Sequence, residues 1–115
     1  MTSPSGMSVR LGLLLRQAHR RAAAALNDAL APLGITGRHF GVLLLIERDG
    51  VSTQRDLIRE TGSDKAGMVR TVEDLENLGY LSRTRSTTDK RVTELVLTEA
   101  GRTAFESAKR LAGAA

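Results

Sequence analysis

The sequence contains no cysteine and only two histidines. Without cysteine, the chain has no disulfide, no thiolate nucleophile and no cysteine-based zinc or iron–sulfur site. Two histidines leave little for metal binding or general-base chemistry. The sequence also lacks a Gly-x-Ser-x-Gly motif, a P-loop and a His-Glu-x-x-His motif. We therefore expect no enzymatic activity, no metal and no cofactor.

Long hydrophobic runs are absent too. No apolar run is longer than Val42–Ile46, which is far below the roughly 18 residues that indicate a membrane span. Residues 1–6 have neither a basic stretch nor a long apolar stretch, which predicts that there is no signal peptide. We expect a cytoplasmic protein with no membrane partner.

The length and the charge give the first positive indications. A chain of 115 residues and 12.4 kDa fits one domain. Seventeen Lys and Arg residues against thirteen Asp and Glu give a net charge of +4, and the sequence pI is about 10.3. This excess of positive charge favours a polyanionic partner, either nucleic acid or an acidic membrane surface.

The N-terminal third predicts a tail and one long helix. Residues 1–7 are rich in serine, proline and glycine and are expected to form a flexible tail. Over residues 8–34, leucine and alanine recur at i, i+3, i+4 and i+7, the spacing of an amphipathic helix, and Pro32 and Gly34 are stop signals. The apolar face of this helix exceeds what a small domain can cover, which favours a partner helix.

Three shorter helices follow. One is predicted from an N-cap at Thr36 to about Asp49, the second has Ser52 as its N-cap, and the third has Ser63. Helical spacing places five residues on the buried face of the third helix: Met68, Val69, Val72, Leu75 and Leu78. The last two helices are joined by a three-residue turn with a central glycine, Thr61–Ser63, which is the helix-turn-helix pattern.

The periodicity then changes to that of strands. Residues 80–85 and 92–97 are predicted strands, and the polar turn 86–91 between them has a basic tip. A last helix begins after a cap at Thr98. The predicted fold is mainly α with a small β-hairpin, a winged helix-turn-helix in a single domain of residues 8–115 with a long N-terminal helix.

These segments resemble the multiple-antibiotic-resistance-regulator (MarR) family of bacterial winged-helix transcription factors. The resembling stretches are Ala31–Thr36, Asp64–Leu81, Asp89–Arg91 and Leu95–Gly101, of which the Asp-x-Arg wing followed by Leu-Thr-x-Ala-Gly is the most specific. The resemblance implies a homodimer on a short pseudo-palindrome, with helices 8–34 and 98–115 contributing to dimerisation. Many members release DNA on binding small, often aromatic, anions. Some respond to cysteine oxidation, a route that a cysteine-free chain lacks.

The sequence departs from the family pattern in three ways. Ala66 and Gly67 stand where the recognition helix often has Ser-Thr; they either let the helix approach DNA closely or form a permissive surface. Gly37 and His39 replace the usual Pro and the Gln or Glu of a capping box, so no capping box is expected. Members normally continue into a sixth helix, which leaves three alternatives: a truncated form, a dimer held by the first and last helices, or weak dimerisation.

The recognition helix carries the predicted base contacts. Arg70 lies on its outward face, where a guanidinium can read G O6 and N7 in the major groove. The alternative is a solvated arginine paired with Glu73 or Asp74. Lys65, at the helix start, is expected to meet phosphate. The predicted set in this helix is Ser63, Lys65, Ala66, Gly67, Arg70 and Thr71.

The wing carries the second predicted set. By resemblance, Arg91 inserts into or beside the minor groove, and Asp89 holds the wing turn and orients it. Without the resemblance, these residues form an ordinary charged turn. The full wing set is Arg83, Arg85, Asp89, Lys90 and Arg91. Of these, Arg83, Arg85 and Lys90 are phosphate candidates, although charges on strand edges also prevent edge pairing.

Two smaller sets complete the prediction. A helix N-terminus that can donate to phosphate is formed by Ser52, Thr53 and Gln54, although capping alone explains Ser52. Arg38 and His39 mark a candidate ligand cleft by resemblance, with a surface role as the alternative. His19 is predicted to be structural or solvent-facing. Three aromatic residues are assigned to the core: Phe40, Tyr80 and Phe105.

Three functions remain open on this basis. The first is a homodimeric, sequence-specific transcriptional regulator, expected to be a repressor, which binds duplex DNA and is released by a small aromatic or anionic effector. The second is an architectural protein that binds DNA with little sequence preference, which the small Ala66-Gly67 pair and the basic wing favour. The third is a winged helix used for protein interaction, which the long apolar helix favours.

Overall fold

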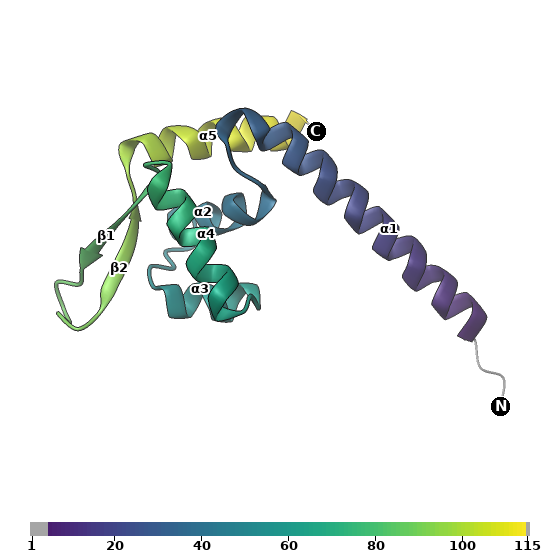
Figure 1. The fold of residues 1–115 in the computed structure, drawn as a ribbon, viewed down its shortest axis with the longest axis horizontal. Helices are drawn as coiled ribbons and strands as arrows, with labels where there is room; N and C mark the ends of the chain where they lie inside the picture. Colours follow the sequence, from purple (N-terminus) through teal and green to yellow (C-terminus); the bar gives the residue numbers. More distant parts are fainter. Residues whose placement is uncertain (1–4, 115) are drawn as a thin grey trace.

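The computed structural model describes residues 5–114 as five α-helices, one short 3-10 helix and a two-stranded antiparallel sheet (Figure 1). In chain order the elements are α1 (Ser5–Leu30), η1 (Ala31–Leu33), α2 (Gly37–Glu47), α3 (Gln54–Thr61), α4 (Lys65–Asn77), β1 (Leu81–Arg85), β2 (Thr93–Leu97) and α5 (Glu99–Ala114). A helix-turn-helix followed by a β-hairpin confirms the predicted fold class.

Helix α1 projects away from the rest of the chain (Figure 1), and the molecule measures 59 × 33 × 22 Å. The Cα radius of gyration is 17.3 Å, against about 13 Å for a compact domain of about 100 residues. The leucines of the projecting part are 53–62% exposed: Leu11, Leu13, Leu14 and Leu15. This confirms that α1 has more apolar surface than its own domain covers.

The ends of α1 differ from the prediction. The helix includes Ser5, so residues 5–7 of the predicted tail are helical, whereas residues 1–4 lie outside the described residues. At the other end the α-helix stops at Leu30, which is fully buried. The 3-10 turn η1 continues to Gly34, whose φ of +76° ends it in the left-handed region that favours glycine.

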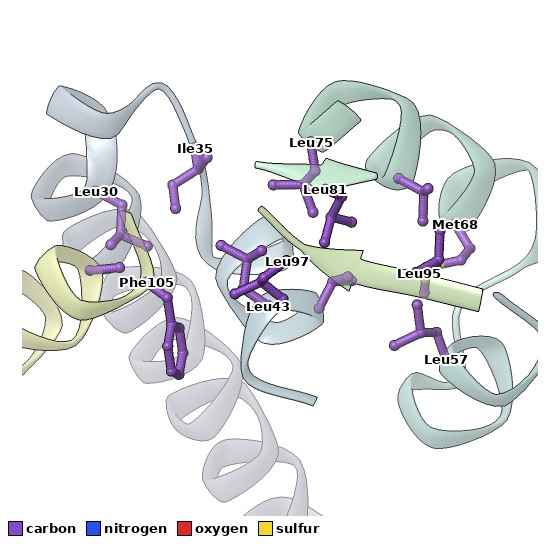
Figure 2. Close-up of a cluster of buried hydrophobic side chains, with 13 residues drawn as sticks. Leu30, Ile35, Leu43, Leu57, Met68, Leu75, Leu81, Leu95, Leu97 and Phe105 are labelled. Carbon is purple, nitrogen blue, oxygen red and sulfur yellow. The ribbon is translucent and has the colours of Figure 1, made fainter. Parts of the chain in front are cut away.

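The core is one cluster of apolar side chains to which all five α-helices and both strands contribute. In Figure 2, Leu95 of β2 lies near Leu57 of α3 and Met68 of α4, and Leu97 lies near Leu43 of α2. The cluster joins the helix-turn-helix to the hairpin, so α4 is held in place along its whole inner face.

The three aromatic residues lie in or against this core, as predicted. Phe105 is buried, and its ring centroid lies 5.9 Å from that of Phe40, in the range of favourable aromatic pairs. Tyr80 is partly buried against the same cluster, and its hydroxyl donates to the carbonyl of Leu33 at 2.9 Å.

The hairpin is held to the body of the domain through β2. Its strands pair with Leu81 opposite Leu97 and Arg85 opposite Thr93, and alternate residues of β2 point into the core. The backbone N–H of Leu95 also donates to the carbonyl of Ser52 at 2.6 Å. The segment before α3 therefore bonds to β2 and fixes the base of the wing.

The junction between β2 and α5 explains the Thr-x-x-Gly sequence there. Thr98 caps α5, since its Oγ1 accepts the N–H of Gly101 at 2.9 Å and donates to the carbonyl of Gly79 at 2.5 Å. Its own N–H donates to the carbonyl of Tyr80 at 3.0 Å. A Cβ at position 101 would overlap that Tyr80 carbonyl, so only glycine lets α5 start this close to β1.

Two N-caps lie one residue later than predicted. Helix α3 is capped by Thr53, whose Oγ1 accepts a backbone N–H three residues on at 3.1 Å, and not by Ser52. Helix α4 is capped by Asp64, whose Oδ1 accepts the N–H of Gly67 at 2.7 Å, and not by Ser63. A carboxylate is favoured at the positive end of a helix dipole, which explains the second difference.

Helix α2 has the predicted N-cap at Thr36, but the expectation that it lacks a capping box is wrong. The imidazole of His39 takes the part of the missing Gln or Glu, because its Nδ1 accepts the N–H of Thr36 at 3.0 Å. An unprotonated imidazole nitrogen is an acceptor of the same kind as a carbonyl oxygen.

Candidate nucleic-acid interface

Helix α4 is positioned by its buried face. Met68, Val72 and Leu75 are buried, as predicted, and Val69 is half-buried. Leu78 is the exception: it is 41% exposed, because it stands beyond the last helical residue, where the chain leaves the buried stripe. The opposite side of the first half of α4 is left open to solvent.

Three of the predicted recognition residues share this open side. Lys65, Ala66 and Arg70 are exposed. Within residues 5–114, Arg70 has no ion-pair partner, so the alternative pairing with Glu73 or Asp74 is not present. A long guanidinium without an intramolecular partner is available to a ligand approaching α4.

The other predicted recognition residues are used inside the domain. Thr71 is 1% exposed, and its hydroxyl donates to the carbonyl of Gly67 at 2.9 Å, so its place in the predicted DNA-contacting set is wrong. A Cβ on Gly67 would lie 2.6 Å from the Asp64 carboxylate that caps α4, which gives this glycine a structural reason. Ser63 is half-buried, and its hydroxyl donates to the carbonyl of Asp64 at 3.1 Å.

The turn at the tip of the wing is held by side-chain hydrogen bonds. Ser86 is buried, and its hydroxyl accepts the N–H groups of Thr88 and Asp89 at 3.2 and 3.3 Å. The Asp89 carboxylate then accepts from Arg91 three times, from the backbone N–H at 3.0 Å and from the guanidinium at 3.1 and 3.3 Å. This confirms that Asp89 holds the turn and orients Arg91, whose side chain is 90% exposed.

The remaining basic residues of the wing divide into two kinds. Arg85 and Lys90 are exposed. Arg83 instead forms a two-pronged pair with Glu76 of α4, at 2.9–3.1 Å. This hydrogen bonding raises the pKa of Arg83 above its usual value and ties β1 to α4, so Arg83 has a structural task beside the predicted phosphate contact.

Helix α3 carries two basic residues that the sequence analysis missed, Arg55 in its first turn and Arg59 in its last. Both side chains are exposed, and they line a depression together with Thr53, Asp56 and Val92. The guanidinium of Arg59 is paired with the Asp56 carboxylate at 2.7 Å. The i, i+4 spacing of the two arginines on an amphipathic helix was the signal that could have found them. Of the predicted residues here, Thr53 is the N-cap, and Ser52 accepts a bond from β2 through its carbonyl. Gln54 is half-buried.

Of the two residues predicted to line a ligand cleft, one lines a cavity in the structure. A cavity of about 450 Å³ lies between α1 and α2, and Arg38 lines it, whereas His39 does not. The full lining is His19, Ala22, Ala23, Leu26, Asn27, Thr36, Gly37 and Arg38. His19 therefore faces a cavity as well as solvent, which its place in α1 alone could not indicate.

The two walls of this cavity touch at Gly37. Its N–H donates to Oδ1 of Asn27 in α1 at 2.8 Å, and a Cβ there would lie 2.9 Å from Cδ2 of Leu26. A residue without a side chain thus lets α2 begin directly against α1.

Within the part of the chain that the structure describes, no helix taken singly has the length and hydropathy to cross a membrane. Only residues 8–33 and α2 taken together reach that length and hydropathy, and the two segments are bent by 74° relative to each other.

The sequence and the structure can now be compared with known proteins. The model of the MarR family matches residues 33–92, from the end of η1 through the wing. The chain belongs to the MarR family. Among curated proteins, this MarR-family chain is similar to the uncharacterized HTH-type transcriptional regulator YdgJ of Bacillus subtilis, with 34% identity over 77 residues, which are 67% of this chain. The matched part spans about half of that relative, 47% of its length.

Two solved MarR-family structures are similar over most of the chain. One is CouR from Rhodococcus jostii, bound to p-coumaroyl-CoA, with a TM-score of 0.81 and 32% identity over 90% of this chain and 73% of that chain. The other is a mutant MarR from Escherichia coli complexed with operator DNA, with a TM-score of 0.81 and 27% identity over 97% of this chain and 80% of that chain.

Proposed function

We propose that this protein is a transcriptional regulator that binds duplex DNA as a homodimer and has no catalytic activity. The observation that carries the proposal is the common side of α3, α4 and the wing. In Figure 1 the start of α4, helix α3 and the wing tip all lie along the lower edge of the view. The exposed basic side chains of these three elements include Arg55, Arg59, Lys65, Arg70, Arg85, Lys90 and Arg91.

The geometry suits a duplex because it offers two different kinds of contact. The first half of α4 is narrow and carries small residues around Arg70, which suits entry into a major groove. Arg91 stands at the end of a rigid turn, which suits a narrow, negatively charged minor groove beside it. The structure of a mutant E. coli MarR complexed with operator DNA supports duplex DNA as the partner.

The exposed apolar face of α1 supports the homodimer. Isolated leucines at the surface are ordinary, but Leu11, Leu14 and Leu15 form a continuous stripe on a projecting helix. A second copy of α1 offers an equivalent stripe under a two-fold axis. Such a dimer would present two recognition helices to successive major grooves, about 34–36 Å apart.

The cavity between α1 and α2 supports a small effector, and we propose that a bound effector releases DNA from a repressor. Its walls combine apolar Ala22, Ala23 and Leu26 with the cation of Arg38. This combination suits a flat apolar body that carries a negative charge. CouR, which was solved with p-coumaroyl-CoA, supports an effector of this kind.

The test is selection of bound sites from a random duplex library at moderate salt. Recovery of an inverted repeat, with half-site centres about 10 base pairs apart, is the expected result. Enrichment of unsymmetrical or merely A·T-rich DNA would favour an architectural protein, and no enrichment would favour a protein-interaction module. A catalytic function has no support in the chain's constellations of side chains.

A further inference from the structure

His39 connects α2, which borders the cavity, to α4, which carries the proposed base-contacting residues. On α2 its Nδ1 accepts the N–H of Thr36 at 3.0 Å, and toward α4 its Nε2 lies 2.9 Å from Oδ2 of Asp74. The imidazole is 13% exposed. Asp74 stands one turn after Arg70 on the recognition helix, so the contact reaches the helix that carries the proposed base reader.

The hydrogen bonds define the tautomer of the imidazole. A backbone N–H can only donate, so Nδ1 carries no proton in this arrangement. The ring proton of the neutral form is therefore on Nε2, where it donates to the Asp74 carboxylate. Both ring nitrogens are occupied, and a rotation of the ring about χ1 or χ2 would break both bonds.

The polar path continues on the other side of α2. The N–H of Gly37 donates to Oδ1 of Asn27 in α1 at 2.8 Å. Asn27, Thr36 and Gly37 all line the cavity between α1 and α2, and His39 is bonded to one of them, Thr36. Two hydrogen bonds therefore connect Thr36 in the cavity wall to Asp74 in α4 through His39, and the Thr36–Gly37 peptide joins them to the bond with Asn27.

We propose that His39 is a positioning residue that transmits the occupancy of the α1–α2 cavity to the recognition helix. An occupant that displaces Thr36 and Gly37 moves the capping imidazole, which releases or redirects its bond to Asp74. The orientation of α4, and with it the fit of Arg70 to DNA, then changes. This inference rests on the proposed function, because its effect on affinity needs a DNA-binding protein.

The alternative is that His39 merely satisfies the end of α2. That alternative explains the bond to Thr36 but does not explain the bond to Asp74. It also predicts that perturbing the cavity and removing Asp74 have independent effects, which gives the two readings opposite outcomes in a double-mutant cycle.

The cycle uses Ala23→Phe as a permanent occupant of the cavity and Asp74→Ala as the break in the path. Ala23 is half-buried in α1 and lines the cavity. We expect Ala23→Phe to weaken binding to the selected operator by about tenfold, a typical size for coupling between two sites. In the Asp74→Ala background the same change should weaken binding by less than about twofold. Equal effects of Ala23→Phe in both backgrounds would overturn the proposal.

Two further variants distinguish the proposed role of His39 from two simpler effects, the loss of a negative charge on α4 and the loss of the cap of α2. Glu73→Ala is the matched control, since it removes one exposed carboxylate from the same turn of α4, and it should leave the tenfold effect of Ala23→Phe intact. His39→Gln keeps a capping-box acceptor for Thr36 but loses the imidazole that reaches Asp74, and it should behave like Asp74→Ala. A His39→Gln protein that responds to Ala23→Phe as the wild type does would also overturn the proposal.

A DNA-free measurement keeps this inference apart from the proposed function. In amide NMR spectra, Ala23→Phe should shift resonances of α4 in the wild type and leave them unshifted in the Asp74→Ala background. If no duplex binds but this difference holds, the regulator proposal is wrong and the path is right; unshifted α4 resonances in the wild type would overturn the path. Where Ala23→Phe does not fold, Gly37→Ala replaces it, since its Cβ would press on Leu26 at 2.9 Å.

Discussion

Asp89 and Arg91 are bound to each other by three hydrogen bonds, one from the Arg91 backbone and two from its guanidinium. The pair holds an exposed arginine in one orientation at the tip of the wing. An exposed ion pair contributes little to stability, so its value lies in presenting the guanidinium. If the wing contacts DNA as proposed, this pair presents the Arg91 guanidinium to the duplex, which leads to two predictions.

Arg91→Ala should weaken binding to every duplex by a similar factor, about tenfold, because a minor-groove or phosphate contact carries little sequence information. If each protomer meets about four phosphates, the wild-type dimer should give a slope near −7 for log affinity against log salt. The variant should be shallower by about 1 to 2. Filter binding or fluorescence anisotropy at four salt concentrations measures both quantities.

Arg102→Ala is the control for that experiment. Arg102 lies on α5 and pairs with Glu47, so its loss changes the net charge equally and touches no part of the proposed interface. Its affinity and salt slope should match the wild type. An Arg91→Ala protein that is indistinguishable from Arg102→Ala would remove the wing from the interface.

Arg91→Ala should also raise the pKa of Asp89. In the native protein the hydrogen bonds from Arg91 hold the pKa of Asp89 below its ordinary value of 3.8. A depressed carboxyl pKa means that the stabilisation is present above the ordinary value and is lost as pH falls through the native pKa. The bonds between Asp89 and Arg91 should therefore be present at neutral pH and weaken only in acid, whereas the bonds that the Ser86 hydroxyl accepts do not depend on this titration. Carboxyl carbon shifts followed by NMR between pH 2 and 6 check the direction, and an unchanged titration in Arg91→Ala would contradict it.

Arg70→Ala should act on sequence preference where Arg91→Ala does not. A guanidinium bonded to G O6 and N7 discriminates by about 1–3 kcal/mol at one base pair. Selection with the variant should return the same repeat with one relaxed position in each half-site. A uniform loss of affinity with an unchanged consensus would assign Arg70 to phosphate. Arg70→Lys helps to distinguish these outcomes, since lysine keeps the charge but not the two-pronged geometry.

The helices and strands were predictable because the apolar periodicity is regular in each, with a helical period in α1 and alternation in β2. The errors lie where two neighbouring residues could do the same task. Ser52 and Thr53 both carry a cap hydroxyl, and the bond of the Ser52 backbone to β2 is a tertiary contact that spacing does not encode. At Ser63 and Asp64, the carboxylate is the better cap.

The candidate site was predictable in part. Arg91 and Asp89 came from a local motif, and the structure gives them the expected geometry. The prediction for Thr71 was wrong because it relied on the polar side chain and not on the position. Thr71 lies three residues after the buried Met68 and therefore on the same face of α4. The contact between His39 and Asp74 joins residues 35 apart in the chain, and only the packing of α2 on α4 brings them together.

Leu14→Glu should dissociate the proposed dimer. Leu14 is 56% exposed on the stripe of α1, and a carboxylate placed in an apolar helix interface without a partner is strongly unfavourable. We expect the dissociation constant of the dimer to rise by about 100-fold or more. Light scattering after size exclusion measures it. Arg20→Glu is the control, since it introduces the same residue outside the leucine stripe, and it should leave the dimer intact. If both variants remain dimeric, the stripe of α1 is not the dimer interface and α5 becomes the next candidate.

Gly101→Ala should destabilise the domain by about 3 kcal/mol, at the upper end of what overpacking costs. The added Cβ would overlap the carbonyl oxygen of Tyr80 and lie 2.9 Å from its carbonyl carbon. Because those atoms are backbone, no side chain can turn away to make room. Relief would require moving α5 from β1, which also pulls Thr98 from the carbonyls of Gly79 and Tyr80.

Gly113→Ala is the matched control, since it lies on the same helix with nothing within 4 Å of an added Cβ. Alanine is favoured over glycine in helices by up to about 1 kcal/mol, so this variant should be neutral or slightly stabilised. Urea unfolding of both proteins, followed by circular dichroism at 222 nm, measures the difference. If Gly101→Ala unfolds at the same urea concentration as Gly113→Ala, the close approach of α5 to Tyr80 does not hold in solution, and the Thr-x-x-Gly sequence needs another explanation.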